Sequence, residues 1–130
     1  RMVFYPGYTI GNLEPDSARQ FLEQIPDVVG NGGGAIVGGD LHKSGDILQA
    51  AYNDGAGVTA EFNLNLLSRL NSLIDAAFEP GRFRHEAFYN EQARRVEMHL
   101  VSAEQQTVRV NGTYVDCDRD ETLHTENSYN

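Results

Sequence analysis

Residues 2–15, with the sequence MVFYPGYTIGNLEP, decide the fold expected for this chain. Residues 2–5 are an apolar run typical of a short buried strand, and Pro6-Gly7 should end that strand. Pro15 suits the first turn of a helix, where the acidic residues on either side of it favour the positive end of the helix dipole. We therefore predict a strand, a glycine-containing loop and a helix.

Asn12 lies in that loop, beyond the carboxyl end of the predicted strand. In open α/β sheets ligands bind at this place, so Asn12 could hold a small polar ligand. It could equally cap the helix that follows, which is a common role of asparagine. The residues alone leave both interpretations open.

The predicted helix carries an apolar stripe of Ala18, Phe21, Leu22 and Ile25. We expect Pro26 to end or kink it near residue 25, because the proline ring clashes with the preceding turn. The glycine run at residues 30–34 then precedes a buried strand at 35–37. A phosphate-binding loop needs its glycines after a strand and before a helix, so this run predicts a turn. Strand, helix and strand together form half of a doubly wound α/β sheet.

The sequence pattern changes after residue 42, where we place a domain boundary. We predict helices at 47–53 and 59–75, the second with an apolar face formed by Phe62, Leu66, Leu70 and Leu73. Beyond Pro80 the hydrophobic period falls to two, and Asn111-Gly112 predicts a hairpin. With a last strand at about 121–127, this part should be a helix pair with an antiparallel meander.

Composition and charge exclude several functions. The chain has 19 acidic and 10 basic residues, a net charge of -9 that would repel nucleic acid and anionic membranes. No run approaches the roughly 20 apolar residues of a membrane span. Cys117 is the single cysteine, which excludes a disulfide framework and predicts a packed thiol, with the cytoplasm as default location. The four histidines lack metal-ligand spacing, so no metal site is predicted.

Four other residues have a plain interpretation and a functional one. Tyr52 in an amphipathic helix and Met98 in an alternating strand are typical of core positions. Glu126 and Ser128 are two apart near the end of the last strand, so they share a face. They could bind a ring with two nitrogens, although a solvated strand edge is the plainer interpretation.

Five segments together resemble one known family. They are FYPGYTIGN (4–12), GGDLHK (38–43), AAYNDGAGVTAEFNLNLLSRLN (50–71), FYNEQARRVEMHLVS (88–102) and HTENSY (124–129). In this order they closely resemble the histidine Nα-methyltransferases of ergothioneine biosynthesis. That resemblance implies transfer of three methyl groups from S-adenosylmethionine to the α-amino group of L-histidine, which gives hercynine. It also implies that residues 1–42 are the later part of a Rossmann-like methyltransferase core, and that residues 43–130 are most of an α+β substrate-binding domain with an antiparallel sheet.

The resemblance implies substrate contacts and identifies no catalytic base. The loop around Gly7 and Asn12 would approach the amino acid head, and the Tyr52 hydroxyl would contact the substrate carboxylate. Met98 would form an apolar wall, while Glu126 and Ser128 would bind the imidazole. These roles replace the plainer interpretations given above, and they rest on the resemblance alone.

The chain also departs from the family's pattern. Tyr8 stands where the family usually has a small residue. The glycine motif for S-adenosylmethionine and the acidic residue for its ribose belong to an earlier segment, so we expect the chain to lack the cofactor-binding half and to be inactive alone. Two alternatives remain: a methyltransferase for another small amine or amino acid, and a non-catalytic binding domain for a small molecule.

Overall fold

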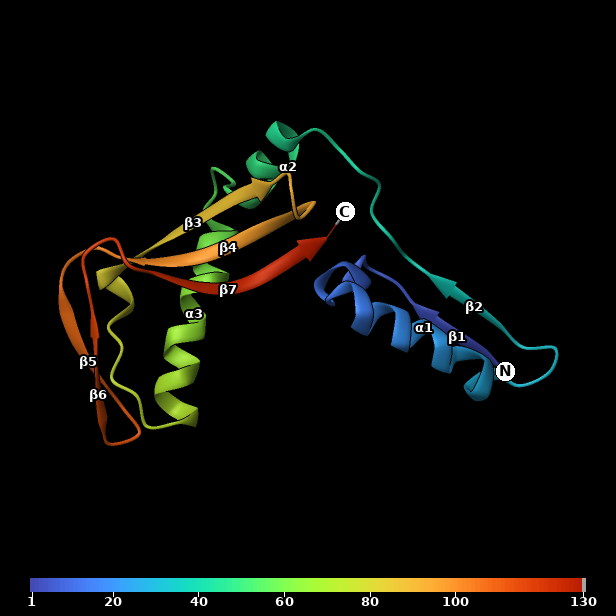
Figure 1. The fold of residues 1–130 in the computed structure, drawn as a ribbon, viewed down its shortest axis with the longest axis horizontal. Helices are drawn as coiled ribbons and strands as arrows, with labels where there is room; N and C mark the ends of the chain where they lie inside the picture. The colour runs from blue at the N-terminus through green and yellow to red at the C-terminus, as the bar shows by residue number, and fades with distance from the viewer. Residues whose placement is uncertain (130) are drawn as a thin grey trace.

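The structure is a computed structural model that describes residues 1–129, a mixed α/β fold with one parallel strand pair and two antiparallel sheets (Figure 1). The elements are, in order, β1 (Met2–Tyr5), the 3-10 helix η1 (Thr9–Asn12), α1 (Pro15–Val29), β2 (Gly34–Val37), α2 (Gly45–Tyr52), α3 (Val58–Leu73), the 3-10 helix η2 (Pro80–Arg82), β3 (Phe83–Asn90), β4 (Arg95–Ser102), β5 (Gln106–Val110), β6 (Thr113–Cys117) and β7 (Thr122–Tyr129).

The first three regular elements form a strand–helix–strand unit, as predicted. β1 and β2 pair in parallel, with Phe4 opposite Ile36. α1 packs against one face of this pair, where the rings of Tyr5 and Phe21 lie 4.6 Å apart. On the other face Met2, Phe4 and Ile36 are 69%, 68% and 53% exposed. The described residues therefore leave one apolar face of the parallel pair uncovered.

α1 is longer than predicted, because it continues through Pro26 to Val29. A proline inside a helix deprives the carbonyl four residues earlier of its donor, here that of Leu22. Leu22 and Pro26 both lie on the exposed side of α1, where water can satisfy that carbonyl. On the inner side, Ile25 and Val29 remain partly buried and continue the helix along the sheet.

The second sheet has the order β3-β4-β7, all antiparallel. Its core lies between this sheet and the two helices α2 and α3, in two clusters. The buried residues are Leu48, Ala87, Val96 and Met98 in one cluster, and Leu67, Phe83 and Leu100 in the other. The alternation predicted for β4 is confirmed, since Val96, Met98 and Leu100 all face these helices.

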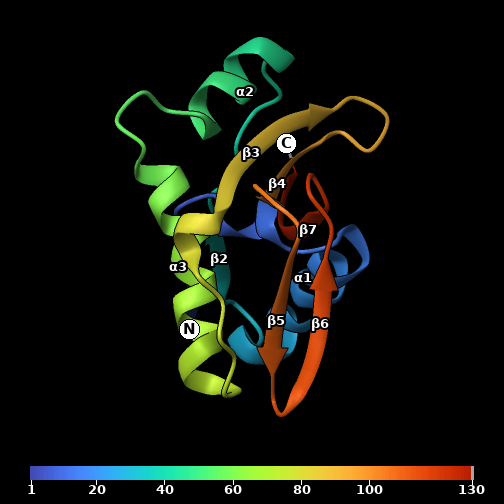
Figure 2. The same cartoon turned by 90° about the vertical axis from the view of Figure 1, so that its left-hand side faces the viewer.

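The predicted meander is wrong in its strand order. β5 and β6 do form the hairpin expected at Asn111-Gly112, whose φ angles of 48° and 77° suit a two-residue turn. They stand apart as a sheet of their own (Figure 2), and β4 pairs with β7 instead. The Ser102 amide donates to the Glu121 carbonyl over 2.9 Å, and the Asp120 amide donates to the Ser102 carbonyl. These bonds return the chain to the edge of β4 after the hairpin.

The predicted apolar face of α3 is also wrong in part. Phe62 and Leu73 are 65% and 70% exposed, and the helix buries Asn63 and Leu67 instead. A polar residue can occupy this buried position because its hydrogen bonds are made. The Asn63 amide donates to His85 Nδ1 over 3.0 Å and to the His99 carbonyl over 3.1 Å.

A bulge in β7 changes which residues face the helices. The register with β4 shifts between Met98 and His99, so that Met98 pairs with Glu126 but His99 pairs with His124. Thr125 is the extra residue, and its hydroxyl donates to the Met98 carbonyl over 2.9 Å. Before the bulge, Leu123 packs on the core. After the bulge, Glu126 and Ser128 face the same side of the sheet as Leu123.

Two expectations from composition can be compared with the structure. Cys117 is buried in β6, and burial raises the pKa of its thiol, as expected for a packed side chain. Within residues 1–129, every helix is too short or too polar to cross a membrane.

We predict that Asn63→Ala lowers the free energy of unfolding by about 2 kcal/mol, because it leaves buried hydrogen-bonding groups on His85 and His99 without a partner. Chemical denaturation of the two proteins measures the difference. Asn65→Ala, on the exposed side of the same helix, is the matched control, since it changes helix propensity equally. Equal stabilities of the two variants would contradict the structural role of Asn63.

Candidate functional site

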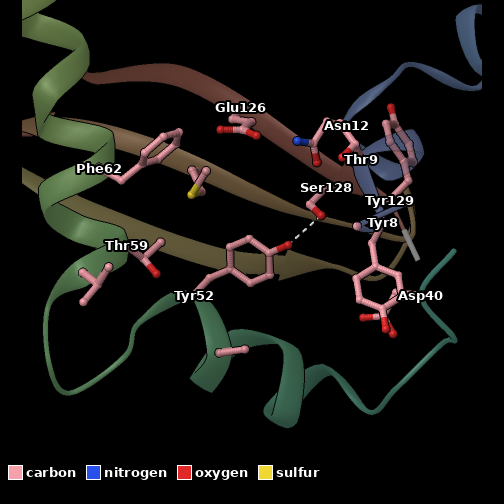
Figure 3. Close-up of a pocket in the computed structure, with 14 residues that line it drawn as sticks. Tyr8, Thr9, Asn12, Asp40, Tyr52, Thr59, Phe62, Glu126, Ser128 and Tyr129 are labelled. Carbon is pink, nitrogen blue, oxygen red and sulfur yellow. Dashed lines mark hydrogen bonds between the residues drawn. The ribbon is translucent and has the colours of Figure 1, made fainter. Parts of the chain in front are cut away.

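A pocket of about 510 Å³ lies between the loop after β1, the end of β7 and the helices α2 and α3 (Figure 3). All the substrate contacts implied by the resemblance line it: Gly7, Asn12, Tyr52, Met98, Glu126 and Ser128. Residues more than a hundred positions apart in the sequence therefore share one cavity.

The N-terminal wall of the pocket is shaped by a turn with unusual backbone angles. Gly7 and Tyr8 have φ angles of 80° and 59°, in the left-handed region. A Cβ atom added to the facing Gly38 would lie 3.2 Å from the Gly7 nitrogen, so the two loops approach closely. Asn12 ends η1 and does not cap α1, whose N-cap is Glu14. The capping interpretation of Asn12 is therefore wrong.

Tyr52 is held in place through its backbone. His85 Nε2 donates to the Tyr52 carbonyl over 2.9 Å, while Asn63 donates to His85 Nδ1. These two bonds define a neutral imidazole that carries its proton on Nε2. α3, β3 and the end of α2 are thus linked through one buried asparagine and one histidine.

The Tyr52 hydroxyl donates to Ser128 Oγ over 2.6 Å (Figure 3). The resemblance had implied that these two residues bind opposite ends of a substrate. In the structure they are in direct contact across the pocket, with Asn12 extending from η1 beside them. Tyr52 and Ser128 therefore form the middle of the site.

Glu126 pairs with Met98 of β4 and lies between Phe62 and Asn12 in the view of Figure 3. Among residues 1–129 no hydrogen bond or ion pair reaches its carboxylate, and burial raises its pKa. A partly buried carboxylate without a hydrogen-bond partner is unfavourable. It is correspondingly well placed to accept hydrogen bonds from a ligand that brings N–H groups.

The pocket also contains residues that sequence reasoning did not assign to a site. They are Tyr8, Thr9, Asp40, Ala51, Val58, Thr59, Phe62 and Tyr129. Asp40 could have been found, because it follows β2 at the carboxyl end of the parallel pair. Its carboxylate binds Lys43 Nζ at 2.7 Å and 2.8 Å, and this bond lowers its pKa. Phe62 had been assigned to the core face of α3.

A group of potential metal ligands, Glu97, His99 and His124, lies outside this pocket, with ligand atoms within 4.8 Å of one another. The two imidazoles are stacked, with centroids 4.5 Å apart and planes at 14°, so their lone pairs do not converge on a point. Burial opposes ionisation of Glu97, but hydrogen bonds led by Arg95 outweigh it and lower its pKa. His99 Nε2 lies 3.3 Å from Glu97 Oε2, His124 Nε2 lies 2.7 Å from Asn127 Oδ1, and His99 Nδ1 is buried without a hydrogen-bond partner among residues 1–129. The β4–β7 pairing assembles this group, which sequence spacing could not reveal.

The residues present do not fit S-adenosylmethionine. The glycine run at 30–34 forms the predicted turn, in which Gly30 and Gly32 have φ angles of 73° and 77°. It joins the end of α1 to the start of β2 and contributes nothing to the lining of the pocket. Within the described part of the chain no glycine-rich loop joins a strand to a helix in the spacing that a nucleotide requires.

Comparison with known proteins gives a consistent result. The model of a family described as histidine-specific, SAM-dependent methyltransferases matches residues 1–130. The chain is 39% identical over 128 residues to a histidine N-alpha-methyltransferase of Mycobacterium tuberculosis, covering 97% of this chain and 40% of that protein. It is 41% identical over 110 residues to the protein of the same name from Mycolicibacterium smegmatis, covering 85% of this chain and 34% of that protein.

A more distant relative has a different named substrate. The chain is 29% identical over 110 residues to an L-tryptophan methyltransferase of Psilocybe serbica, covering 83% of this chain and 31% of that protein. The chain thus spans well under half the length of these relatives. Because the family model covers every residue of the chain, the chain belongs to the family of histidine-specific, SAM-dependent methyltransferases.

Proposed function

We propose that the protein containing this chain transfers methyl groups from S-adenosylmethionine to the α-amino nitrogen of L-histidine, in the cytoplasm, and so makes hercynine for ergothioneine biosynthesis. The observation that carries the proposal is the Glu126 carboxylate, which is partly buried, has no partner among residues 1–129 and lines the same pocket as Asn12. A free histidine offers an imidazole N–H to the first and a polar head to the second.

The substrate lies along the pocket with its two ends held. Glu126 accepts a hydrogen bond from the imidazole, and Met98 packs against the ring as an adaptable apolar wall. The loop of Gly7 and Asn12 holds the amino acid head at the other end. Fixing both ends orients the amine between them, which is the main contribution a protein makes to a transfer between two bound molecules.

Tyr52 and Ser128 couple the two ends. The Tyr52 hydroxyl has one proton, which it donates to Ser128 Oγ. A substrate carboxylate at Tyr52 takes over that proton as a stronger, charged acceptor. Binding of the head at Tyr52 therefore changes the hydrogen bonding of Ser128, the residue that we place beside the ring.

S-adenosylmethionine supplies the methyl group when it is bound, and we place its site in the rest of the protein. Two observations support this division. The chain spans 40% of the length of its Mycobacterium tuberculosis relative, and the face of β1 and β2 that carries Met2 and Phe4 is exposed. A two-stranded parallel sheet needs further strands and a helix on its open face. We therefore propose that residues 1–42 belong to a Rossmann-like core and residues 43–130 to the substrate domain.

Tryptophan is the second candidate substrate, because one relative is named as an L-tryptophan methyltransferase. An indole offers one N–H and no ring nitrogen that accepts. Glu126 could bind that N–H, whereas an imidazole could also engage Ser128. Glu126 and Ser128 together therefore favour histidine over tryptophan as the substrate.

The proposal is tested by incubating the full-length protein with S-adenosylmethionine and a panel of amino acids that includes histidine and tryptophan. We expect three successive methylations of histidine by mass spectrometry, and a kcat/KM for tryptophan at least tenfold lower. The 130-residue chain alone should give no methylated product. Turnover of tryptophan at an equal or higher rate would replace histidine as the substrate, and absence of turnover on the whole panel would favour a non-catalytic binding domain.

We predict that Glu126→Ala in the full-length protein weakens histidine binding by about 1.5–3 kcal/mol, the contribution of a charge-assisted hydrogen bond. Calorimetric titration measures the dissociation constants. Glu91→Ala, on the exposed turn after β3, is a control that removes the same charge away from the pocket. Equal affinities of the two variants would show that Glu126 does not contact the substrate.

We predict that the advantage of Glu126 over Glu126→Gln depends on pH. The raised pKa of Glu126 means that it takes up a proton at a pH where exposed glutamates are still ionised. As the pH falls through that pKa, the carboxylate that accepts the imidazole N–H is lost. The ratio of the two histidine dissociation constants should therefore approach one at low pH. Ionisation of free histidine affects both dissociation constants equally and cancels in their ratio. A ratio that is independent of pH would therefore exclude the Glu126 carboxylate as the acceptor of the imidazole N–H.

A further inference from the structure

A set of polar contacts joins the start of the chain to its end, next to the pocket. Glu14 lies just before α1, and its two carboxylate oxygens accept from different residues of β7. Asn127 Nδ2 donates to Glu14 Oε1 over 2.9 Å, and the Tyr129 hydroxyl donates to Glu14 Oε2 over 2.5 Å. These hydrogen bonds connect residues more than a hundred positions apart.

Arg95 of β4 anchors this set to the sheet. Its Nη1 donates to the Tyr129 hydroxyl over 2.8 Å and lies 3.9 Å from Glu14. Its Nε and Nη2 both bind Glu97 Oε1, at 2.9 Å and 2.8 Å. The Glu97 side chain is only 9% exposed, so a buried carboxylate fixes the position of the Arg95 guanidinium. The Tyr129 hydroxyl therefore both accepts from Arg95 and donates to Glu14.

The backbones of the same two segments are in direct contact at Gly11. A Cβ at this position would lie 2.6 Å from the Tyr129 carbonyl oxygen, closer than real Cβ atoms approach. Gly11 is in η1, between Thr9 and Asn12, which line the pocket. Any separation of η1 from β7 would move Asn12 away from Ser128 and Glu126.

We propose that Glu14, Tyr129 and Arg95 form a latch that holds η1 against β7 and thereby sets the width of the substrate pocket. Glu14 and Tyr129 are positioning residues: they act on the substrate through Asn12 on one side and through Ser128 and Glu126 on the other. The inference rests on the proposed function for the identity of the ligand, but the latch itself is a property of the fold.

The charges of the latch match this role. Hydrogen bonds from Tyr129 and Asn127 lower the pKa of Glu14, and those of Arg95 with Tyr129 and Glu97 raise the pKa of the guanidinium. Glu14 is therefore the charged acceptor that both donors of β7 require. Among residues 1–129, removal of the Glu14 carboxylate leaves the Tyr129 hydroxyl bound to Arg95 and removes both side-chain hydrogen bonds between residues 9–14 and β7.

The test uses three variants of the full-length protein: Glu14→Gln, Tyr129→Phe and the double variant. Tyr129→Phe keeps the ring that lines the pocket and removes only the hydroxyl. Glu23→Gln is the control, because it removes an equal charge from an exposed i,i+4 pair on α1, with Arg19 at 3.9 Å. The control should match the parent protein in every measurement.

Hydrogen exchange measures the latch directly. The amides of Gly11 and Leu13 are hydrogen-bonded within η1, to the carbonyls of Tyr8 and Ile10. In both single variants we expect these amides to exchange at least threefold faster, with exchange in α3 unchanged. Unchanged exchange at Gly11 and Leu13, or an equal increase throughout the protein, would overturn the proposal.

Binding measures the consequence for the pocket. We expect KM for the amino acid to rise about threefold to tenfold in each single variant, with KM for S-adenosylmethionine unchanged. KM for the amino acid in the double variant should exceed KM in either single variant by less than twofold, because both changes break the same contact between Glu14 and Tyr129. Fully multiplicative effects, or unchanged KM with faster exchange, would overturn a positioning role. If exchange follows the prediction but the parent protein binds another amino acid of the panel and not histidine, the latch stands and the proposed substrate is wrong.

Discussion

The pairing of β7 with β4 is the interaction on which the candidate site depends. It carries Glu126 and Ser128 into the pocket, and its bulge at Thr125 sets the phase of the side chains. Without the extra residue, the alternation that buries Leu123 would turn Glu126 and Ser128 to the opposite face of the sheet. The hydrogen bond from the Thr125 hydroxyl to the Met98 carbonyl therefore lies next to the two pocket-lining residues of the strand.

Two carboxylates on this sheet, those of Glu97 and Glu126, differ in their hydrogen-bond partners and therefore in the direction of their pKa shifts. Glu97 is more deeply buried, but it binds Arg95 and Asn90 and its pKa is lowered. Glu126 faces the pocket without a partner among the described residues, and its pKa is raised. A buried charge that has hydrogen-bond partners fixes the neighbouring side chains. A buried charge without partners favours binding of a ligand that supplies them. The first anchors the proposed latch, and the second lines the pocket.

Much of the fold was predictable, and the errors have physical causes. The strands and helices follow from periodicity, and the hairpin follows from Asn111-Gly112. The end of α1 was misplaced because tertiary packing of its inner side outweighs the local cost of Pro26. The face of α3 was misassigned because sequence patterns count Asn63 as polar, while the structure satisfies it with His85 and the His99 carbonyl. The partner of β4 could not be predicted, because pairing depends on how the chain returns after a hairpin.

The sequence by itself determined the local elements, the absence of a disulfide framework and, through five segments that together resemble one family, the family. It also supplied the candidate residues, since peptides at both ends of the chain carry them. Only the tertiary structure decided that these peptides share a cavity, that Tyr52 donates to Ser128, and that Glu14 joins Tyr129 across the chain. The reason is that periodicity and turn chemistry act over a few residues, whereas strand register and close backbone approach at Gly11 arise only when distant segments pack together.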